Sequence, residues 1–243
     1  MINFITLQIL NIFDFFHKRK IKIFLKRLKK RNLDLIIDVG AHKGETILFF
    51  LNNFIIKKIY SLEASDINFK KLEEEFLYIK KKFPYTEILI ENIALGSKNQ
   101  SAKFKQFYES SSSTFSNINI HSDYFKKKFR FLNKTKENKF FYEKTIDLIC
   151  LSDYLTKKKI SFIDILKIDT EGYEFEVIKG LQKRIRDVDI IYFEHHYDTM
   201  IEKNYTFREI NRYLIKNNFQ KIYKLKMPFR KTFEYIYRNK EKI

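Results

Sequence analysis

Apolar and polar positions along the chain alternate between two kinds of segment from residue 33 onward. Residues 33–39 and 163–168 are nearly continuous apolar runs, the pattern of central strands in a parallel sheet. Residues 43–53 and 66–82 have helical spacing, and Ser65 or Asp66 can cap the second helix. Shorter apolar runs predict further strands at 57–62, 87–93, 102–108, 219–225 and 232–238.

The order of these segments predicts an α/β fold with a doubly wound, mostly parallel sheet. Repeated strand–helix units connect parallel strands through right-handed crossovers. The last two strands, 219–225 and 232–238, read as a closing antiparallel pair. Since one core can serve up to about 250 residues, and no repeat or linker is visible, residues 33–243 are assigned to one domain.

The N-terminal segment, residues 1–32, is predicted to be helical and separate in character from that domain. Residues 2–16 are apolar on nearly every face, and the basic residues follow them, so the segment lacks the order of a secretory signal. The apolar stretch 2–16 is also shorter than the about 20 residues that a membrane-spanning helix needs. Two interpretations stay open: it packs on its own domain or a second subunit, or it lies on a membrane with its basic run facing anionic headgroups.

Residues 109–139 interrupt the strand–helix rhythm. A serine-rich stretch at 110–116 cannot bury much apolar surface, and the stretch after it is lysine-rich. Irregular stretches of this length in compact domains are usually functional or disordered. We therefore expect an insertion or lid here.

The first chemical motif is the turn after the first strand, Gly40-Ala-His-Lys-Gly44. A dinucleotide pyrophosphate would need a glycine where His42 stands, so the turn does not favour a nicotinamide cofactor. S-adenosylmethionine carries no phosphate and removes that requirement. Gly40 allows the tight turn and Gly44 the close packing of the helix, while Glu63, at the end of the next strand, suits the two ribose hydroxyls.

The second motif joins a buried strand directly to two acids. The sequence Lys167-Ile-Asp-Thr-Glu-Gly172 puts Asp169 and Glu171 at the carboxyl end of that strand, where ligands bind in open α/β sheets. The next strand ends in Glu194 and two histidines. Neighbouring strand ends therefore bring several titratable groups together.

Together these motifs resemble the FkbM-type family of S-adenosylmethionine-dependent methyltransferases. Three further elements match in order, so the resemblance spans roughly residues 33–196: Asn92-Ile-Ala-Leu-Gly96, Thr145-Ile-Asp-Leu148 and Ile190-Ile-Tyr-Phe-Glu194. It implies a class I, Rossmann-like fold with S-adenosyl-L-methionine as cofactor. The cofactor-binding residues that it implies are Asp38 at the methionyl end, the turn residues Gly40, Ala41 and Gly44, Glu63, and Asn92 with Ile93 beside the adenine. The family usually has Asn where this chain has His42.

Methyl transfer to a hydroxyl is helped by a nearby base. Asp169 is our candidate for this role or for orienting the hydroxyl, and Glu171 for binding the acceptor. His196 (or His195) is the alternative base, because an unperturbed histidine pKa of about 6.5 suits it. Helix capping by Glu171 and a metal ion held by Asp169, Glu194 and a histidine stay open as alternatives; no metal ligand is assigned.

The net charge of +18 does not change this interpretation, because it is peripheral. Residues 17–31 carry nine Lys or Arg and no acid, and 124–144 and 216–243 are also basic, so the remainder carries about −4. The composition, rich in Lys, Ile, Asn and Phe, offers one explanation; attraction to an anionic lipid surface or glycan offers another. Because the motif-bearing core is not basic, no nucleic-acid partner is expected.

One cysteine, Cys150, excludes an intrachain disulfide and favours a reducing, cytoplasmic location, with peripheral contact at the inner face of a membrane as an alternative. The resemblance implies a hydroxyl acceptor, a sugar of a surface polysaccharide or glycolipid. A non-sugar small-molecule acceptor and a non-catalytic basic module that binds membrane or nucleic acid are the alternatives. The oligomeric state stays open.

Overall fold

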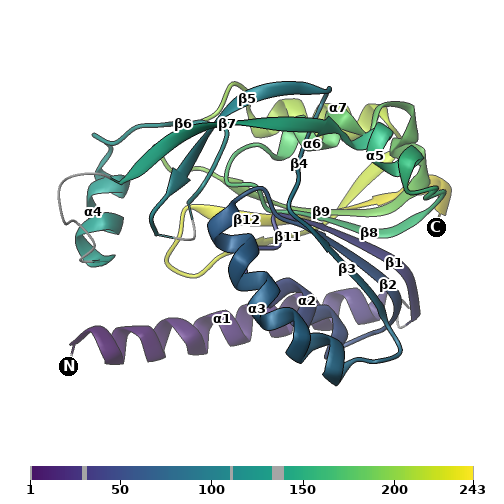
Figure 1. Cartoon of the computed structure of the whole chain (residues 1–243), viewed down its shortest axis with the longest axis horizontal. Helices are drawn as coiled ribbons and strands as arrows, with labels where there is room; N and C mark the ends of the chain where they lie inside the picture. The colour runs from purple at the N-terminus through teal and green to yellow at the C-terminus, as the bar shows by residue number, and fades with distance from the viewer. Residues whose placement is uncertain (1, 29–31, 110–111, 133–139, 243) are drawn as a thin grey trace.

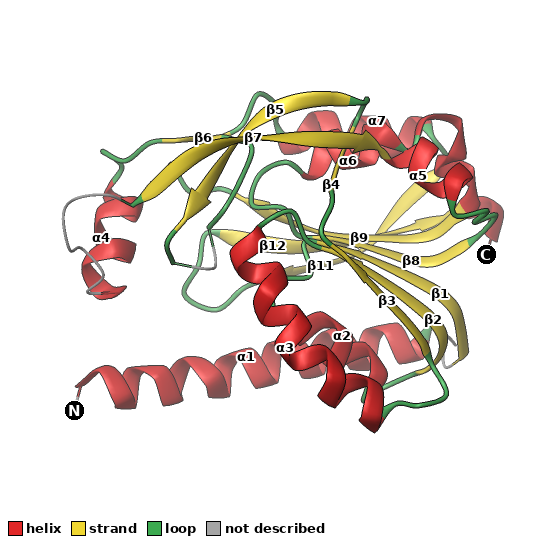
Figure 2. Ribbon diagram, viewed as in Figure 1, coloured by secondary structure: helices red, strands yellow, loops and turns green. Residues whose placement is uncertain are grey.

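A seven-stranded sheet organises the molecule (Figures 1 and 2), in the order β11-β12-β9-β8-β1-β2-β3. The computed structural model describes residues 2–28, 32–109, 112–132 and 140–242, with the backbone alone at 2–12 and 131–132. The sheet strands are β1 (Asn32–Val39), β2 (Ile55–Leu62), β3 (Glu87–Glu91), β8 (Ile163–Ile168), β9 (Val188–His196), β11 (Phe219–Lys226) and β12 (Thr232–Asn239). All neighbours pair in parallel except β12, which is antiparallel to both β9 and β11. The predicted mostly parallel sheet with an antiparallel C-terminal pair is confirmed.

The middle strands owe their position to continuous apolar sequence. Every residue of β8 and β9 is buried, and β1 is buried from Leu35 to Val39. Such strands must be covered on both faces, which helices do in a doubly wound fold. The carboxyl ends of β1, β2 and β8 therefore meet at one edge of the sheet.

Helices cover both faces of the sheet (Figure 2). On one face lie α1 (Ile2–Arg27), α2 (Glu45–Leu51) and α3 (Asp66–Lys82), which pack on the sheet through Ile21, Leu25, Phe50 and Leu72. On the other lie α5 (Leu151–Lys157), α6 (Glu174–Gly180) and α7 (Phe207–Lys216), together with the short 3-10 turn Gln182–Asp187. A second 3-10 turn, Lys240–Lys242, ends the described chain.

Helix boundaries follow local chemistry. Ser65 is the N-cap of α3, since its hydroxyl accepts a hydrogen bond from the Asn68 amide at 3.2 Å. The predicted helix at 43–53 is shorter in the structure, Glu45–Leu51, because Gly44 adopts a left-handed conformation (φ 95°) that a helix cannot include. Within the described part of the chain, no helix combines the length and hydropathy required to cross a membrane.

The segment between β3 and α5 forms a layer of its own above the main sheet (Figure 1). Its three-stranded sheet has the order β4-β7-β5, with bounds Ala94–Gly96, Phe141–Cys150 and Gln100–Phe107. The described part of the 109–139 segment contains β6 (Asn117–Ile118), which pairs with β10 (Ile201–Glu202), and α4 (Asp123–Leu132). The α4 side chains Phe125 and Phe129 pack on Phe107, so this segment carries a small aromatic core.

Candidate active site

The turn after β1 touches the loop after β8. Gly40 has φ 87°, and a Cβ on it would lie 1.8 Å from the carbonyl oxygen of Asp169. The amides of Gly40 and Ala41 donate to the Leu62 carbonyl at 2.8 and 3.1 Å, which fixes the turn on β2. Only glycine fits a backbone approach this close. The two motifs singled out in the sequence are therefore in direct contact.

Glu63 is buried (6% exposed) at the end of β2. Its two carboxylate oxygens accept the backbone amides of His42 at 2.7 Å and Ser65 at 2.8 Å. Burial raises its pKa to about 6 against the opposing effect of these amides. Because an ionised carboxylate offers about four acceptor sites, each oxygen keeps capacity for a ligand hydroxyl.

Asp38 is fully buried, and neither of its oxygens has a hydrogen-bond partner among the described residues. Burial raises its pKa to about 7, and nearby Lys167 partly opposes that rise. A buried carboxylate without a partner is costly. The position therefore suits a cationic group, such as the ammonium of an amino-acid ligand, or an ordered water.

Gly44 lies below the turn, and its Cβ position would contact the Leu72 and Ile79 side chains at 3.1 and 3.2 Å.

A cavity of about 370 Å³ opens above these residues. This volume is within the range of small-molecule sites, roughly 300–1,000 Å³. Six predicted site residues line it: Gly40, Ala41, Glu63, Ile93, Asp169 and Glu171. The lining of the cavity does not include four other predicted residues, Asp38, Gly44, Asn92 and His196.

The floor of the cavity holds a buried charge cluster, which we define as Lys167, Asp169, Glu194 and Glu234. Lys167 is 4% exposed, and its Nζ lies 3.4 Å from Asp169 Oδ2 and 3.7 Å from Glu194 Oε1. Burial lowers the pKa of Lys167, but the surrounding acids outweigh that effect and raise it. Conversely, burial raises the pKa of Asp169, but Lys167 outweighs it and the pKa is lowered. Lysine and aspartate are thus both charged at neutral pH.

Glu194 and Glu234 complete the charge cluster on β9 and β12, where they are register partners. Burial, and then the Asp169 charge, raise the pKa of Glu194 well above its ordinary value. Glu234 accepts hydrogen bonds from the Tyr192 hydroxyl and from His17 Nε2. His17 belongs to α1, so the N-terminal helix reaches into the wall of the cavity.

The sequence carries a signal for some of these groups: the second motif begins with Lys167, and the next strand ends in Glu194, although the motif assigns Lys167 no role. Lys167 is a charged residue inside an apolar strand. Tyr192 and Glu194 are two positions apart in β9 and therefore lie on the same face of that strand. No local signal pairs His17 with Glu234, since 217 positions separate them.

The loop that carries Glu171 is held from two sides. Fully buried Glu174 accepts from the Gly172 amide at 2.8 Å and from the Tyr205 hydroxyl at 2.7 Å. Thr114 of the 109–139 segment donates its hydroxyl to the Glu171 carbonyl at 2.7 Å. The helix-capping alternative for Glu171 is wrong: α6 begins at Glu174, and no side chain caps its first turn.

His196 lies behind Glu171 instead of on the cavity surface. Its Nε2 is 3.6 Å from Glu171 Oε2, and its Nδ1 is 3.1 Å from Thr232 Oγ1 and 3.5 Å from Asp198 Oδ2. Burial lowers the pKa of His196, but the charge of Glu171 and the hydrogen bond to Asp198 outweigh burial and raise this pKa to about 9. An imidazole that is already protonated at neutral pH cannot accept a proton. The geometry favours a role in holding Glu171.

The other predicted groups have separate surroundings. His195 faces away from the cavity among Tyr197, Tyr205 and Phe207, and burial lowers its pKa to about 3. Asn92 is exposed and donates its side-chain amide to the Glu63 carbonyl at 2.8 Å. A direct adenine contact by Asn92 stays a prediction, whereas Ile93 lines the cavity.

The metal-assisted alternative places an ion between Asp169, Glu194 and a histidine. In the structure the Lys167 ammonium lies between these two carboxylates. In the part of the chain that the structure describes, no group of three His, Cys, Asp or Glu side chains is arranged to hold a metal ion.

Comparison with known proteins adds a family to this geometry. Residues 38–221 match the sequence profile of the Methyltransferase FkbM domain, three quarters of the chain. No curated protein sequence matches the chain.

Three solved structures of methyltransferases have folds similar to that of this chain. A Methyltransferase FkbM from Methylobacillus flagellatus KT superposes with a TM-score of 0.56 at 12% identity, covering 84% of this chain and 43% of that one. Magnesium protoporphyrin IX methyltransferase from Synechocystis PCC 6803 was solved with bound S-adenosylmethionine and with its demethylated product. These two give TM-scores of 0.51 and 0.52 at 7% and 8% identity, covering 94% and 95% of this chain and 80% and 84% of theirs. This chain thus spans less than half of the FkbM neighbour, and identities this low support the fold alone.

Proposed function

This chain belongs to the FkbM methyltransferase family, and we propose that it transfers the methyl group of S-adenosyl-L-methionine to a hydroxyl of a sugar in a surface polysaccharide or glycolipid. One observation carries the proposal. The backbone of the cofactor turn at Gly40 lies against the backbone of Asp169, so the cofactor site and the candidate base share one cavity.

The donor end of the cavity suits S-adenosylmethionine. Glu63 can accept from both ribose hydroxyls while its amide bonds hold it in place. Asp38 is buried behind the turn and does not line the cavity, so we expect it to hold the methionyl end through an ordered water. The acids around the cavity also favour a ligand with a positive sulfonium. The cofactor brings a methyl group that is already activated for displacement.

The acceptor end supplies a base and positioning groups. We propose that Asp169 accepts the hydroxyl proton as the oxygen attacks the methyl carbon in line with the departing sulfur. Its side chain is 31% exposed and opens on the cavity, and Lys167 keeps it ionised. Glu171, whose side chain is 23% exposed, lines the same wall and can accept from a second hydroxyl. Several carboxylates around one opening suit a polyhydroxylated acceptor better than an apolar one.

The cofactor site makes a direct prediction for Glu63. Replacing it by Ala should weaken S-adenosylhomocysteine binding by roughly 1–3 kcal/mol, because hydrogen bonds to a charged acceptor are lost. Isothermal titration calorimetry measures this, and NAD should give no heat of binding to either protein.

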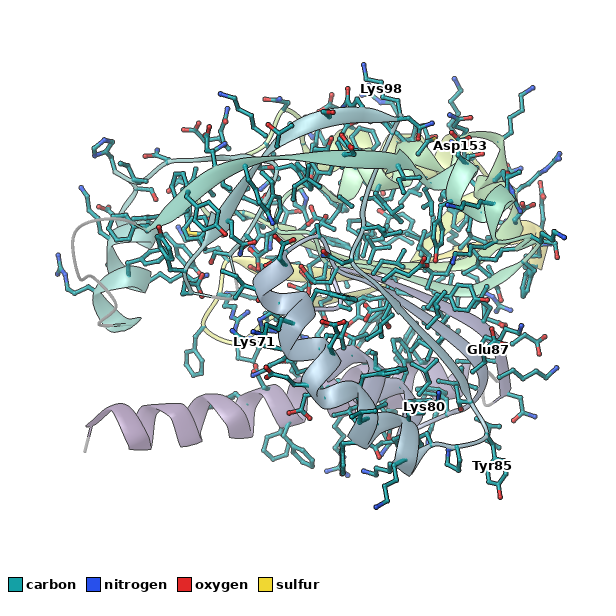
Figure 3. The ribbon with its side chains drawn as sticks, viewed as in Figure 1. Lys71, Lys80, Tyr85, Glu87, Lys98 and Asp153 are labelled. Atoms are coloured by element: carbon teal, nitrogen blue, oxygen red, sulfur yellow. The ribbon has the colours of Figure 1, made fainter. Side chains whose placement is uncertain are left out.

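Glu87→Ala is the matched control, since Glu87 is an acid at the amino end of β3, exposed in Figure 3 and outside the cavity. Equal affinities of the Glu63→Ala variant and the unmodified protein would remove Glu63 from the cofactor site.

A further inference from the structure

Helix α1 packs on the domain with its C-terminal half and projects beyond the main sheet with its N-terminal turns. Its C-terminal half packs on the domain, with Ile21 and Leu25 at 1% and 0% exposure, and His17 bonds to Glu234 one turn earlier. Its N-terminal turns project beyond the edge of the main sheet (Figure 1). The same helix thus forms a wall of the cavity at His17, and its preceding turns extend beyond the edge of the main sheet.

Aromatic side chains are exposed where α1 leaves the domain. Phe13, Phe15 and Phe16 are 42%, 63% and 50% exposed. Phe229, in the turn between β11 and β12, is 68% exposed, and its ring meets that of Phe13 edge-on at 4.8 Å. We call these four side chains the phenylalanine patch. Its rings form two contacting pairs, Phe13 with Phe229 and Phe15 with Phe16, and exposed aromatic side chains gathered in this way usually mark an interaction surface.

The patch is flanked by positive charge. From residue 13 onward α1 carries one acid, Asp14, and six cations: Lys18, Arg19, Lys20, Lys22, Lys26 and Arg27. Lys18 on α1 and Arg230 beside Phe229 also line the cavity, so the basic surface continues to its mouth.

We propose that α1 docks on an anionic phospholipid surface, with the phenylalanine patch between the headgroups and the basic residues against their phosphates. Amphipathic interfacial helices combine these two features. A second copy of this chain fits the surface less well, because a symmetric contact across α1 would bring the same six cations of each helix together.

The docked orientation has a consequence for the cavity. Asp14, His17 and Lys18 line the cavity from α1, and Arg230 lines it from the turn that carries Phe229. A membrane that holds the patch therefore lies beside the mouth of the cavity. If the proposed function holds, a lipid-linked acceptor reaches Asp169 without leaving the membrane surface.

Vesicle co-sedimentation tests the docking without any methyl transfer. We expect the full chain to pellet with vesicles of phosphatidylcholine mixed with phosphatidylglycerol, to pellet far less with phosphatidylcholine alone, and to be released by salt. Phe15→Ser with Phe16→Ser should weaken partition about tenfold or more, since both rings lose their apolar environment. Arg19→Glu with Lys20→Glu should weaken it at least about 25-fold, about fivefold for each charge removed.

Matched variants elsewhere on the surface should leave partition unchanged. Leu77→Ser with Tyr85→Ser removes two side chains that are 74% and 98% exposed, one in the C-terminal half of α3 and the other, labelled in Figure 3, in the turn after it. Lys98→Glu with Lys157→Glu makes the same charge change at two exposed positions: Lys98, labelled in Figure 3, and Lys157 of α5, a helix on the other face of the sheet from α1 (Figure 1).

Equal loss in the α1 variants and these controls would overturn the proposal, as would equal pelleting with both vesicle types. Light scattering that shows a dimer of the unmodified chain and a monomer of the Phe15/Phe16 variant would assign the patch to a second copy instead. S-adenosylhomocysteine calorimetry on the same α1 variants keeps the outcomes separate: loss of vesicle binding with normal cofactor affinity concerns docking alone.

Discussion

Asp169→Asn should lower turnover about 10²–10⁴-fold, the usual contribution of a positioned base, while S-adenosylmethionine affinity stays within a few-fold. The substitution keeps the side-chain shape and the Asp169 backbone that packs on Gly40, but removes the proton acceptor. Steady-state rates with calorimetry of the same protein separate the two quantities.

Two further variants assign the roles around Asp169. Glu171→Gln should mainly raise the KM for the acceptor, since its proposed role is binding that persists into the transition state. His196→Ala should be milder than Asp169→Asn, because His196 lies behind Glu171 and its pKa of about 9 keeps it protonated. A severe His196→Ala defect beside a mild Asp169→Asn defect would show that the base is misassigned. Activity that returns with Mg²⁺ after chelation would support the metal-assisted alternative.

Lys167→Met should cost about 3–5 kcal/mol of unfolding free energy at neutral pH, the usual effect of removing one partner from a buried ion pair. Lys167 is the cation between Asp169 and Glu194, with its ring contact to Tyr192 at 4.8 Å. Urea unfolding measures the loss. Lys98→Met, at an exposed position in Figure 3, should change stability by less than about 0.5 kcal/mol.

The pH dependence of that loss has a definite sign. The raised pKa of Lys167 means that its charge stabilises the folded state fully below about pH 10.4, the ordinary lysine value. This stabilisation is lost only as the pH rises through the pKa of the folded state. The lowered pKa of Asp169 means that its charge stabilises the folded state above about pH 3.9, the ordinary aspartate value. This stabilisation is lost as the pH falls through the pKa of the folded state. The destabilisation should therefore be full near pH 7 and shrink below about pH 4.

Neutralising the acids gives a second test of the same cluster. Lys167→Met combined with Asp169→Asn and Glu194→Gln should recover part of the lost stability, because the two carboxyl groups nearest to the removed ammonium are then neutral. Equal stability of the single variant and the unmodified chain would contradict the assigned ion pairs.

The sheet was predictable because its strands carry their own signal. Continuous apolar sequence in β1, β8 and β9 identified the centre, and the predicted β12 segment, 232–238, matches Thr232–Asn239 to one residue. The predicted family is likewise confirmed. The three-stranded layer was not predicted: β4 pairs with β7 across more than fifty positions, a contact that local pattern does not encode.

The site divides in the same way. The contact between Gly40 and Asp169 follows from two strand ends that meet at one sheet edge, which the sequence order predicts. The link from His17 through Glu234 to Tyr192 depends on how α1 packs against β12 and β9, and helical periodicity fixes no such partner. The exposed position of Asn92 was not predictable either, because it depends on the hydrogen bond that its side-chain amide donates to the Glu63 carbonyl.

The central claim is transfer to a sugar hydroxyl, and one measurement addresses it directly. The protein is incubated with methyl-labelled S-adenosylmethionine and the polysaccharide, glycolipid, RNA and protein fractions of the cells that express it, with the Asp169→Asn variant alongside. Mass spectrometry of the hydrolysed products locates the label. We expect an O-methyl ether of a sugar in the polysaccharide or glycolipid fraction, and a signal about 10²–10⁴-fold lower with Asp169→Asn. Label on a base or a protein side chain, with none on carbohydrate, would contradict the claim.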